Sequence, residues 1–208
     1  AVEPDTLHPW LASTVAGFDL LDGIMDGLFR YNSEQRLQAA LAEGFDLSDD
    51  GLTYAFALRP DVVFHNGEPF TAADVISAWQ TKTNPAFGAY TVLGWDKIAS
   101  IDTRDDLTLI VQTTEPYAPF LSTVATTYLC PTSAIAAGLA EFRETFATAP
   151  IGTGPFRLAA WEPGVRLVLE RFDDYWGTTP QLEEIVYQIV PDAAAQLEGL
   201  RSGIYQLA

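Results

Sequence analysis

Apolar and polar residues follow two different periods along the chain, and this pattern predicts a mixture of helices and strands. One group of apolar residues falls at the three-and-four spacing of a helix: Phe18, Leu21, Ile24, Met25 and Leu28. Over residues 53–59, apolar side chains instead occupy every second position, as in a strand with one buried face. The order of strands and helices is mixed, which indicates the α/β or α+β class.

The sharpest helix boundary lies near residue 71. Thr71 is a good N-cap residue, and Asp74 follows three positions later, where its charge favours the positive end of a helix. Val75 and Trp79 supply an apolar face. Asn84 precedes a proline, which disfavours helical backbone at that position and predicts the end of the helix.

The remaining segments alternate between strand and helix signals. Further strands are predicted at residues 62–65, 98–102, 107–113, 156–160, 165–169 and 184–190. Helices are predicted over residues 132–147 and from Asp192 to a stop at Gly203. Asn66 and Gly67 predict a tight turn, and residues 85–97 read as a loop that carries several aromatic side chains.

Composition and charge narrow the class of partner. Of the 208 residues, 48% are hydrophobic and 19% are charged, which is enough apolar material for a buried core. Eleven Lys and Arg residues face 28 Asp and Glu residues, so the net charge is −17. Such a surface repels phosphate backbones, and nucleic acid is excluded as an expected partner. The sequence contains no apolar run of about 18 residues, the length that a membrane-spanning helix needs.

The residues that could carry out catalysis or bind a metal do not form a recognisable motif. Acidic residues occur as three adjacent pairs, Asp49-Asp50, Asp105-Asp106 and Asp173-Asp174. Neighbouring residues in a turn point apart, whereas a catalytic pair faces across a cleft, so we interpret these acids as solvated turn residues. The two histidines, His8 and His65, match no metal-binding spacing, and we expect no metal and no cofactor.

Two other features are interpreted as structural and not as functional. Cys130 is the only cysteine, so it forms no internal disulfide, and we expect a buried, unreactive thiol. The run from Gly152 to Pro155 lacks the lysine of a phosphate-binding loop, and Pro155 has no N–H to donate. We therefore predict a turn that leads into a strand.

Several of these segments together resemble a known family. The densest stretch is residues 56–79, FALRPDVVFHNGEPFTAADVISAW, and shorter ones stand at residues 7–9, 26–28, 41–44, 48–54, 152–156, 169–171, 175–176 and 202–203. In this order and spacing they resemble the peptide-binding branch of extracytoplasmic solute-binding proteins of ABC transporters, family 5. The resemblance covers nearly the whole chain.

This sequence departs from the family pattern in three respects. The family usually has Asp where this chain has His8, and Glu-Ile-Asp where this chain has residues 204–206. Family members are also typically more than twice as long. The resemblance therefore implies that these residues correspond to an N-terminal portion or to a truncated relative.

The resemblance implies a type II periplasmic-binding-protein-like lobe with a small α/β subdomain inserted into it. Lobe one would comprise residues 1–26 and 151–208, and the insert would comprise residues 27–150. The second ligand-binding lobe would lie outside these residues. Such proteins close two lobes over a ligand and need no catalytic residue, so the resemblance implies that the protein is not an enzyme.

The resemblance also implies ligand-binding positions. The loop after residues 7–9 would line the cleft, which places Ser13, Thr14 and Val15 against the main chain of a peptide. Tyr90 is the next candidate, ahead of Trp95 and Tyr128. Three aromatic residues are expected to pack in the core instead of forming a sugar platform: Trp161, Tyr175 and Trp176.

The function implied is the substrate-binding component of an ABC importer, which binds an extracellular peptide or similar small solute and delivers it to a membrane permease. An extracytoplasmic location with a removed leader follows from the resemblance. A face left by the absent lobe is expected to be apolar and to favour self-association. A one-lobed sensor or interaction module is the alternative function, and a hydrolase is a weaker one.

Overall fold

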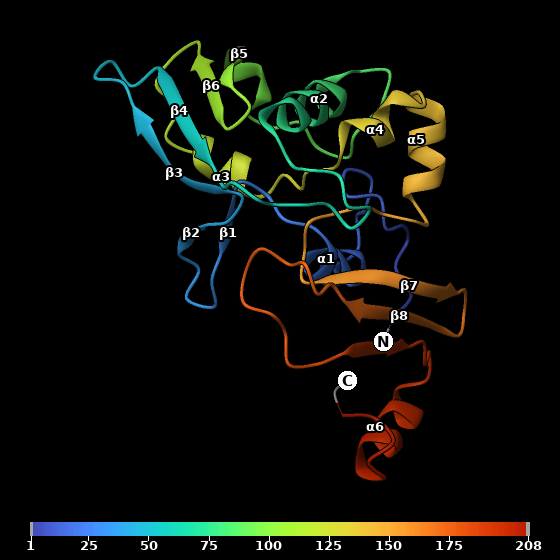
Figure 1. Cartoon of the computed structure of the whole chain (residues 1–208). Coiled ribbons are helices and arrows are strands. Elements are labelled where there is room, and N and C mark those ends of the chain that lie inside the picture. Colours follow the sequence, from blue (N-terminus) through green and yellow to red (C-terminus); the bar gives the residue numbers. More distant parts are fainter. Residues whose placement is uncertain (1, 207–208) are drawn as a thin grey trace.

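The computed structural model describes residues 2–206 and contains a four-stranded and a three-stranded antiparallel sheet with a helix between them, together with a two-stranded hairpin. Figure 1 shows one sheet and helices α2, α4 and α5 at one end of the molecule. Strands β7 and β8 and helix α6 lie at the other end, and α1 lies between the two ends. The mixed class predicted from the sequence is confirmed.

The first sheet has the strand order β3-β4-β6-β5. Its strands are β3 (Ala42–Leu47), β4 (Thr53–Leu58), β5 (Ile98–Asp105) and β6 (Thr108–Thr113). Tyr54, Phe56 and Leu58 of β4 are buried on one face, as the alternating pattern predicts. Strand β3 was not predicted, and its pairing with β4 shifts register between Ala42 and Gly44, which interrupts the alternation of its side chains.

Helix α2 (Ala72–Thr83) begins and ends where the sequence predicts. Thr71 and Asp74 form a reciprocal capping box, with the Thr71 N–H donating to Asp74 Oδ2 at 2.9 Å. Asp74 also accepts hydrogen bonds from the N–H and hydroxyl of Thr132, so this cap fixes the start of a second helix. Trp79 is fully buried on the apolar face of α2.

The predicted continuous helix over residues 132–147 is wrong. The structure has α4 (Thr132–Ala136) and α5 (Leu139–Phe146), separated at Gly138, whose φ is +108°. A left-handed φ of this kind ends a right-handed helix, and glycine adopts it without strain. The apolar segment before these helices forms α3 (Phe120–Ala125), and the aromatic loop ends in a short 3₁₀ helix, η1 (Trp95–Lys97).

The second sheet has the order β7-β8-β9, with β7 (Phe156–Glu162), β8 (Arg166–Arg171) and β9 (Glu184–Gln188). Helix α6 (Ala193–Arg201) follows, capped by Asp192, and Gly203 stands just beyond it with φ +77°. These elements agree with the predicted strands and helix. A separate hairpin of β1 (Phe29–Tyr31) and β2 (Leu37–Ala39) was not predicted.

Two predictions around the first third of the chain require correction. Helix α1 (Val15–Ile24) is shorter than the apolar pattern suggests, because Met25 is already extended and Leu28 lies beyond the helix. Residues 62–65 do not form a strand: they are one arm of a tight loop closed by a single bridge between Val63 and Pro69. Gly67 has φ +83°, so the predicted turn at that position is confirmed.

One buried apolar cluster joins both ends of the molecule, and it includes Ile24, Phe56 and Leu169. The chain segment at residues 152–154 crosses the end of α1 at very short range. A Cβ atom added to Gly152 would lie 2.1 Å from the carbonyl oxygen of Ile24, and the Gly154 N–H donates to that oxygen at 2.9 Å. The glycines therefore allow a close backbone approach, which we call the seam (residues 152–154 against Ile24).

Candidate ligand-binding groove

A groove of about 570 Å³ opens where the first helix meets the upper part of the molecule. Its wall includes one face of α1, the segment after Pro9, the start of β1 and the loops around Tyr90 and Tyr128. The volume lies within the range of small-molecule sites. We call this feature the groove and describe its walls in turn.

Aromatic side chains from three separate segments form one wall of the groove: Trp10, Tyr90 and Tyr128. The Tyr90 N–H donates to the Trp10 carbonyl at 2.8 Å, and the Trp10 indole N–H donates to the Tyr128 carbonyl at 3.1 Å. Tyr128 in turn donates its hydroxyl to the carboxylate of Asp22 on α1. These bonds hold the wall in place before any ligand arrives. Tyr90 itself is 66% exposed.

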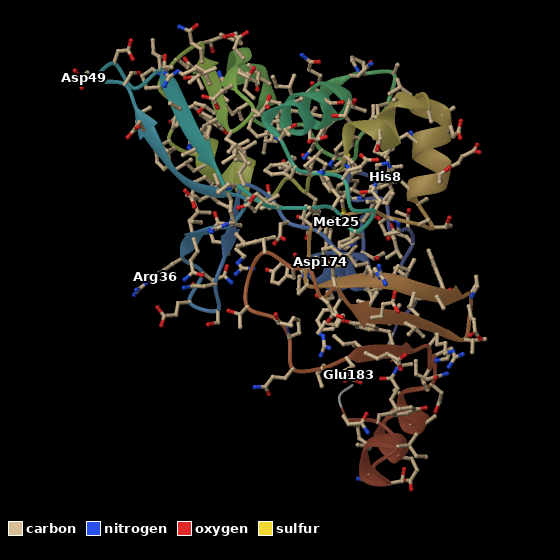
Figure 2. All side chains as sticks on the ribbon, viewed as in Figure 1. His8, Met25, Arg36, Asp49, Asp174 and Glu183 are labelled. Atoms are coloured by element: carbon tan, nitrogen blue, oxygen red, sulfur yellow. The ribbon has the colours of Figure 1, made fainter. Side chains whose placement is uncertain are left out.

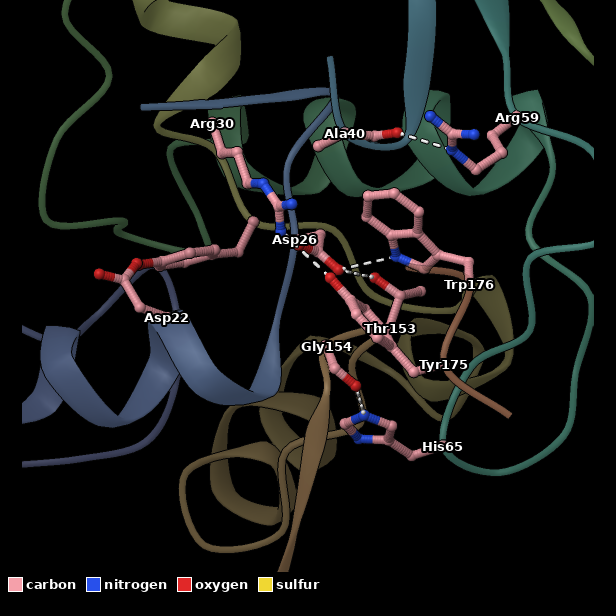
Figure 3. A network of polar contacts seen from close by, with 11 residues as sticks. Asp22, Asp26, Arg30, Ala40, Arg59, His65, Thr153, Gly154, Tyr175 and Trp176 are labelled. Carbon is pink, nitrogen blue, oxygen red and sulfur yellow. Dashed lines mark hydrogen bonds and ion pairs between the residues drawn. The ribbon is translucent and has the colours of Figure 1, made fainter. Parts of the chain in front are cut away.

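An acidic residue with an unusual environment lies at the base of the groove. Asp26 is only 5% exposed and accepts hydrogen bonds from Trp176 Nε1 at 3.0 Å and Thr153 Oγ1 at 3.3 Å. Arg30 lies 3.9 Å from the other carboxylate oxygen. Burial raises the pKa of Asp26 to about 6, against the opposing effects of these partners. Figure 3 shows Asp26 at the centre of this network.

The network also connects the groove to the seam and to the second sheet. Trp176 lies between two guanidinium groups, with Arg59 at 4.7 Å and Arg30 at 5.5 Å from its ring centre. Tyr175 is buried and accepts a hydrogen bond from Arg30 at 3.1 Å. These contacts agree with the expected packing role for the pair Tyr175 and Trp176, and Trp161 is half-buried with its indole N–H donated to Glu3.

A buried cation completes the wall on the side of α2. Lys82 is 7% exposed, lines the groove and donates to Thr127 Oγ1 at 3.1 Å. Its ammonium lies 5.2 Å from the centre of the Trp95 ring. Burial lowers the pKa of Lys82 to about 8.

The loop predicted to contact ligand lies beside the groove instead of within its wall. Ser13 and Val15 are exposed, and neither they nor Thr14 line the groove, although the adjacent Ala12 does. The Ser13 N–H and hydroxyl both donate to Asp5, at 3.0 and 2.7 Å, and the Thr14 hydroxyl donates to Asp5 at 2.8 Å. Partial burial would raise the pKa of Asp5, but these hydrogen bonds lower it.

The aromatic loop separates into buried and exposed members. Trp95, ranked low from the sequence, is buried against Trp79, with the ring centres 5.1 Å apart. Tyr90 and Tyr128 both line the groove. The sequence reasoning missed Trp10, Asp22, Arg30 and Lys82. For α1 a signal existed, because Phe18 and Asp22 are four residues apart and therefore share a helix face.

The structure agrees with the unreactive role expected for several residues. Cys130 is fully buried, and burial raises the pKa of its thiol, with a further contribution from the charge of Asp74. The three acidic pairs are exposed at turns, with Asp105 as the last residue of β5, and Figure 2 shows Asp49 at the tip of the hairpin loop that joins β3 and β4. Within residues 2–206, no group of three potential metal ligands lies together, and no helix is long and apolar enough to cross a bilayer.

The two histidines have different surroundings. His8 is fully buried among aromatic rings, with the Phe142 ring centre at 4.9 Å, and burial lowers its pKa to about 3. His65 contacts both glycines of the seam, through Nε2 to the Gly154 carbonyl at 3.0 Å and through Nδ1, which accepts the Gly152 N–H at 3.3 Å. Burial lowers the pKa of His65 to about 4.

Comparison with known proteins agrees with the family resemblance found in the sequence. The sequence profile of the bacterial extracellular solute-binding proteins, family 5 (middle region), matches residues 36–208. A glutathione-binding protein, GsiB, from Pectobacterium atrosepticum is 29% identical over 204 residues, which is 98% of this chain and 39% of that protein. Protein XP55 from Streptomyces lividans is 34% identical over 205 residues, 36% of its length. The chain thus spans about two fifths of these relatives.

Solved structures show the same fold. The binding protein AgaA from A. tumefaciens R10, in complex with agropinic acid, superposes with a TM-score of 0.90 at 27% identity and covers 98% of this chain and 41% of its own. The oligopeptide-binding protein AppA from Bacillus subtilis, in complex with a nonapeptide, gives a TM-score of 0.91 at 24% identity over 98% of this chain and 41% of its own. At that identity, the second likeness concerns the fold alone.

Proposed function

This chain belongs to the bacterial extracellular solute-binding proteins of family 5, and from that premise we propose that it forms one wall of a ligand cleft in an ABC importer's substrate-binding protein. The family consists of solute-binding proteins and not of enzymes. The observation that carries the proposal is the groove, because its aromatic wall is already held by internal hydrogen bonds and its base carries fixed polar groups. A preformed site of this kind suits capture of a small polar solute.

We propose the domain organisation that the family resemblance implies. Residues 1–26 and 151–208 would form lobe one, residues 27–150 the insert, and chain outside these residues the second lobe. The contact between Ile24 and Gly154 supports this division, because it joins the two separated parts of lobe one through a main-chain hydrogen bond of 2.9 Å. The groove lies beside this contact, where a second lobe would close over it.

The proposed ligand is a peptide or a similar small solute, delivered to a membrane permease. Tyr90 would stack on it, and the loop of Ser13, Thr14 and Val15 would approach its main chain. The Ser13 N–H is already bound to Asp5, so the loop would offer the Ser13 carbonyl, which has no hydrogen-bond partner among the described residues. The glutathione-binding relative makes a γ-linked tripeptide a suitable first probe.

Titration calorimetry on the full-length protein tests the proposal. Short peptides and glutathione should bind, and Tyr90→Ala should weaken the binding about tenfold, because aromatic contacts in a preformed site carry much of the affinity. Leu93→Ala is the matched control, since Leu93 is 84% exposed in the same loop and does not line the groove. Equal losses for both variants would contradict the assignment of the groove, and turnover of peptide would favour a hydrolase.

The alternative of a one-lobed interaction module draws support from a different surface. Apolar side chains are exposed on β9 and α6 and just beyond them, at Val186 (47%), Leu197 (49%) and Ile204 (69%). In the proposed organisation this surface faces the remainder of the protein or favours self-association of this portion alone. Light scattering of residues 1–208 across a concentration series measures this, and a constant monomer mass would argue against it.

We further propose an extracytoplasmic location with a leader removed before residue 1. Members of the family are periplasmic or extracellular proteins, which supports this location. Fractionation of cells that express the full-length gene tests it, and recovery of the protein with the cytosolic fraction would contradict it.

A further inference from the structure

One buried charge in the groove has no counter-ion in the part of the chain that the structure describes. Lys82, in the last turn of α2, is 7% exposed and lines the groove. Among the described residues, no carboxylate lies within 4.0 Å of its ammonium group. Buried lysines are costly unless they are paired, so this arrangement needs an explanation.

The groups that do contact Lys82 are neutral. Thr127 accepts one of the three ammonium protons at 3.1 Å, while the Thr127 hydroxyl donates to the Thr123 carbonyl at 3.1 Å. This second bond fixes the Thr127 oxygen as an acceptor. The Trp95 ring lies 5.2 Å away, and the carbonyl end of α2 adds a weak negative potential. These contacts orient the ammonium group without neutralising it.

The acidic residues of the groove are committed to other partners. Asp22 accepts the hydroxyl of Tyr128, and Asp26 accepts from Trp176 and Thr153 beside the guanidinium of Arg30. Of the described residues, Arg30 is the other cation in the wall, and it already contacts Asp26 and Tyr175. Lys82 is therefore the cation in the groove whose ammonium group still has N–H donors to offer a ligand. The net charge of the protein is −17, yet none of its described carboxylates pairs with this group.

We propose that Lys82 is the specificity-determining residue of the groove and binds a carboxylate of a peptide-like ligand. This inference rests on the proposed function and adds a chemical class to it. The carboxylate would accept the ammonium protons that Thr127 leaves free. Because the site is largely removed from water, a charged partner gains more from this contact than a neutral amide does.

Matched peptides test the inference and separate the two sources of a carboxylate. Calorimetry on the full-length protein would compare Ala-Ala-Ala, its C-terminal amide, and Ala-Glu-Ala amide, which carries only a side-chain carboxylate. The wild-type protein should bind at least one acid about tenfold more tightly than the neutral amide. In Lys82→Met, whose side chain keeps the length and loses the charge, this preference should disappear. Lys97→Met is the control, because Lys97 is the other lysine and lies outside the groove.

A stability measurement on the ligand-free protein distinguishes a binding role from a structural one. If the charge of Lys82 serves a ligand and not the fold, the ligand-free protein gains nothing from it. Lys82→Met should then keep or raise the Tm, because replacement of a buried charge by an apolar side chain often does so. A lowered Tm together with an unchanged acid preference would overturn the inference. Binding of all three peptides without preference would overturn it and leave the proposed function standing, whereas absence of binding by any peptide or glutathione would overturn the peptide-binding function itself.

Discussion

The two sheets both expose apolar side chains on an edge strand, Leu47 of β3 at 46% and Val186 of β9 at 47%, but they differ in the helices that cover their buried faces. In the four-stranded sheet, Tyr54 and Phe56 of β4 are buried, and the Tyr54 ring packs on Phe120 of α3 with the ring centres 4.6 Å apart. In the three-stranded sheet, Leu169 of β8 is buried, yet Val186 on the neighbouring strand is 47% exposed. The first sheet thus has helices of its own to cover it, whereas the second relies on α1.

This difference shows where the molecule is most sensitive. The seam connects the second sheet to the rest of the molecule. There the Gly154 N–H donates a hydrogen bond to the Ile24 carbonyl, and His65 Nε2 hydrogen-bonds the Gly154 carbonyl. The seam also carries Thr153, which bonds Asp26 at the base of the groove. Damage to the seam should therefore affect the second sheet and the groove together, and leave the four-stranded sheet less affected.

The largest effect should come from Gly152→Ala. Its Cβ would lie 2.1 Å from the carbonyl oxygen of Ile24, a backbone atom that cannot move aside without displacing α1. We expect a loss of about 4 kcal/mol in the free energy of unfolding, because the change forces apart two packed backbones. Thermal and denaturant unfolding measure it. Hydrogen exchange should show the loss of protection concentrated in β7, β8 and α1.

Gly44→Ala provides the matched control for that substitution. Gly44 lies in β3, and a Cβ added there meets no atom within 4 Å. Its effect on unfolding should be within about 0.5 kcal/mol, because the added methyl group meets no neighbouring atom. Similar destabilisation by both glycine substitutions would mean that the seam has no special role.

A smaller effect is expected from truncating the core of the second sheet. Leu169 is 1% exposed, so Leu169→Ala should cost about 3 kcal/mol through lost burial and a residual cavity. Val186→Ala, on the exposed face of the adjacent strand, should cost less than about 1 kcal/mol. Denaturant unfolding of the full-length protein measures both. If Val186→Ala were as costly as Leu169→Ala, a part of the protein outside these residues would be covering that face.

The smallest expected effect is a pH dependence of the stability, which arises at His8 beside helix α5. His8 has a lowered pKa of about 3 in the fold, against 6.5 for an exposed histidine. Below pH 6.5, His8 becomes protonated in the unfolded chain but stays neutral in the folded chain. The folded state is therefore fully stable above that pH and loses stability as the pH falls from 6.5 toward 3. The loss should reach about 2 kcal/mol at pH 5.

His8→Phe should remove this sensitivity, because phenylalanine fills the same aromatic surroundings without an ionisable group. His8 Nε2 has no hydrogen-bond partner among the described residues, so the substitution also removes a buried polar atom. Unfolding of both proteins at pH 7.5 and pH 5 measures the difference, which should widen in favour of the variant as the pH falls. Because Asp26 and His65 titrate in both proteins, parallel profiles would show that His8 is not the source.

The sequence predicted a helix or strand accurately where local signals marked both its first and its last residue. Helix α2 is an example, with Thr71 and Asp74 at one end and Asn84 at the other. The prediction failed for residues 132–147, where an alanine-rich helical composition concealed the break at Gly138. It also failed for β3, whose alternation of apolar and polar residues is interrupted at Gly44, where the pairing with β4 shifts register.

The groove was harder to predict than the elements, because its wall is assembled from distant segments. Tyr90 and Tyr128 were candidates from the sequence, and both lie in the wall. Lys82 was not a candidate, because nothing in its local sequence distinguishes a solvated lysine at the end of a helix from a buried one. Its burial depends on Thr127 and Trp95, which reach it from other parts of the chain.

The sequence by itself determined the class of fold, most helices and strands, the acidic surface and the family, since these depend on local periodicity, composition and the order of short motifs. Only the tertiary structure decided which polar residues meet at the base of the groove, why Gly152 and Gly154 must be glycines, and which lysine is left without a counter-ion. Those outcomes depend on contacts between residues far apart in the chain, such as Asp26 with Trp176, and such contacts leave no periodic trace in the sequence.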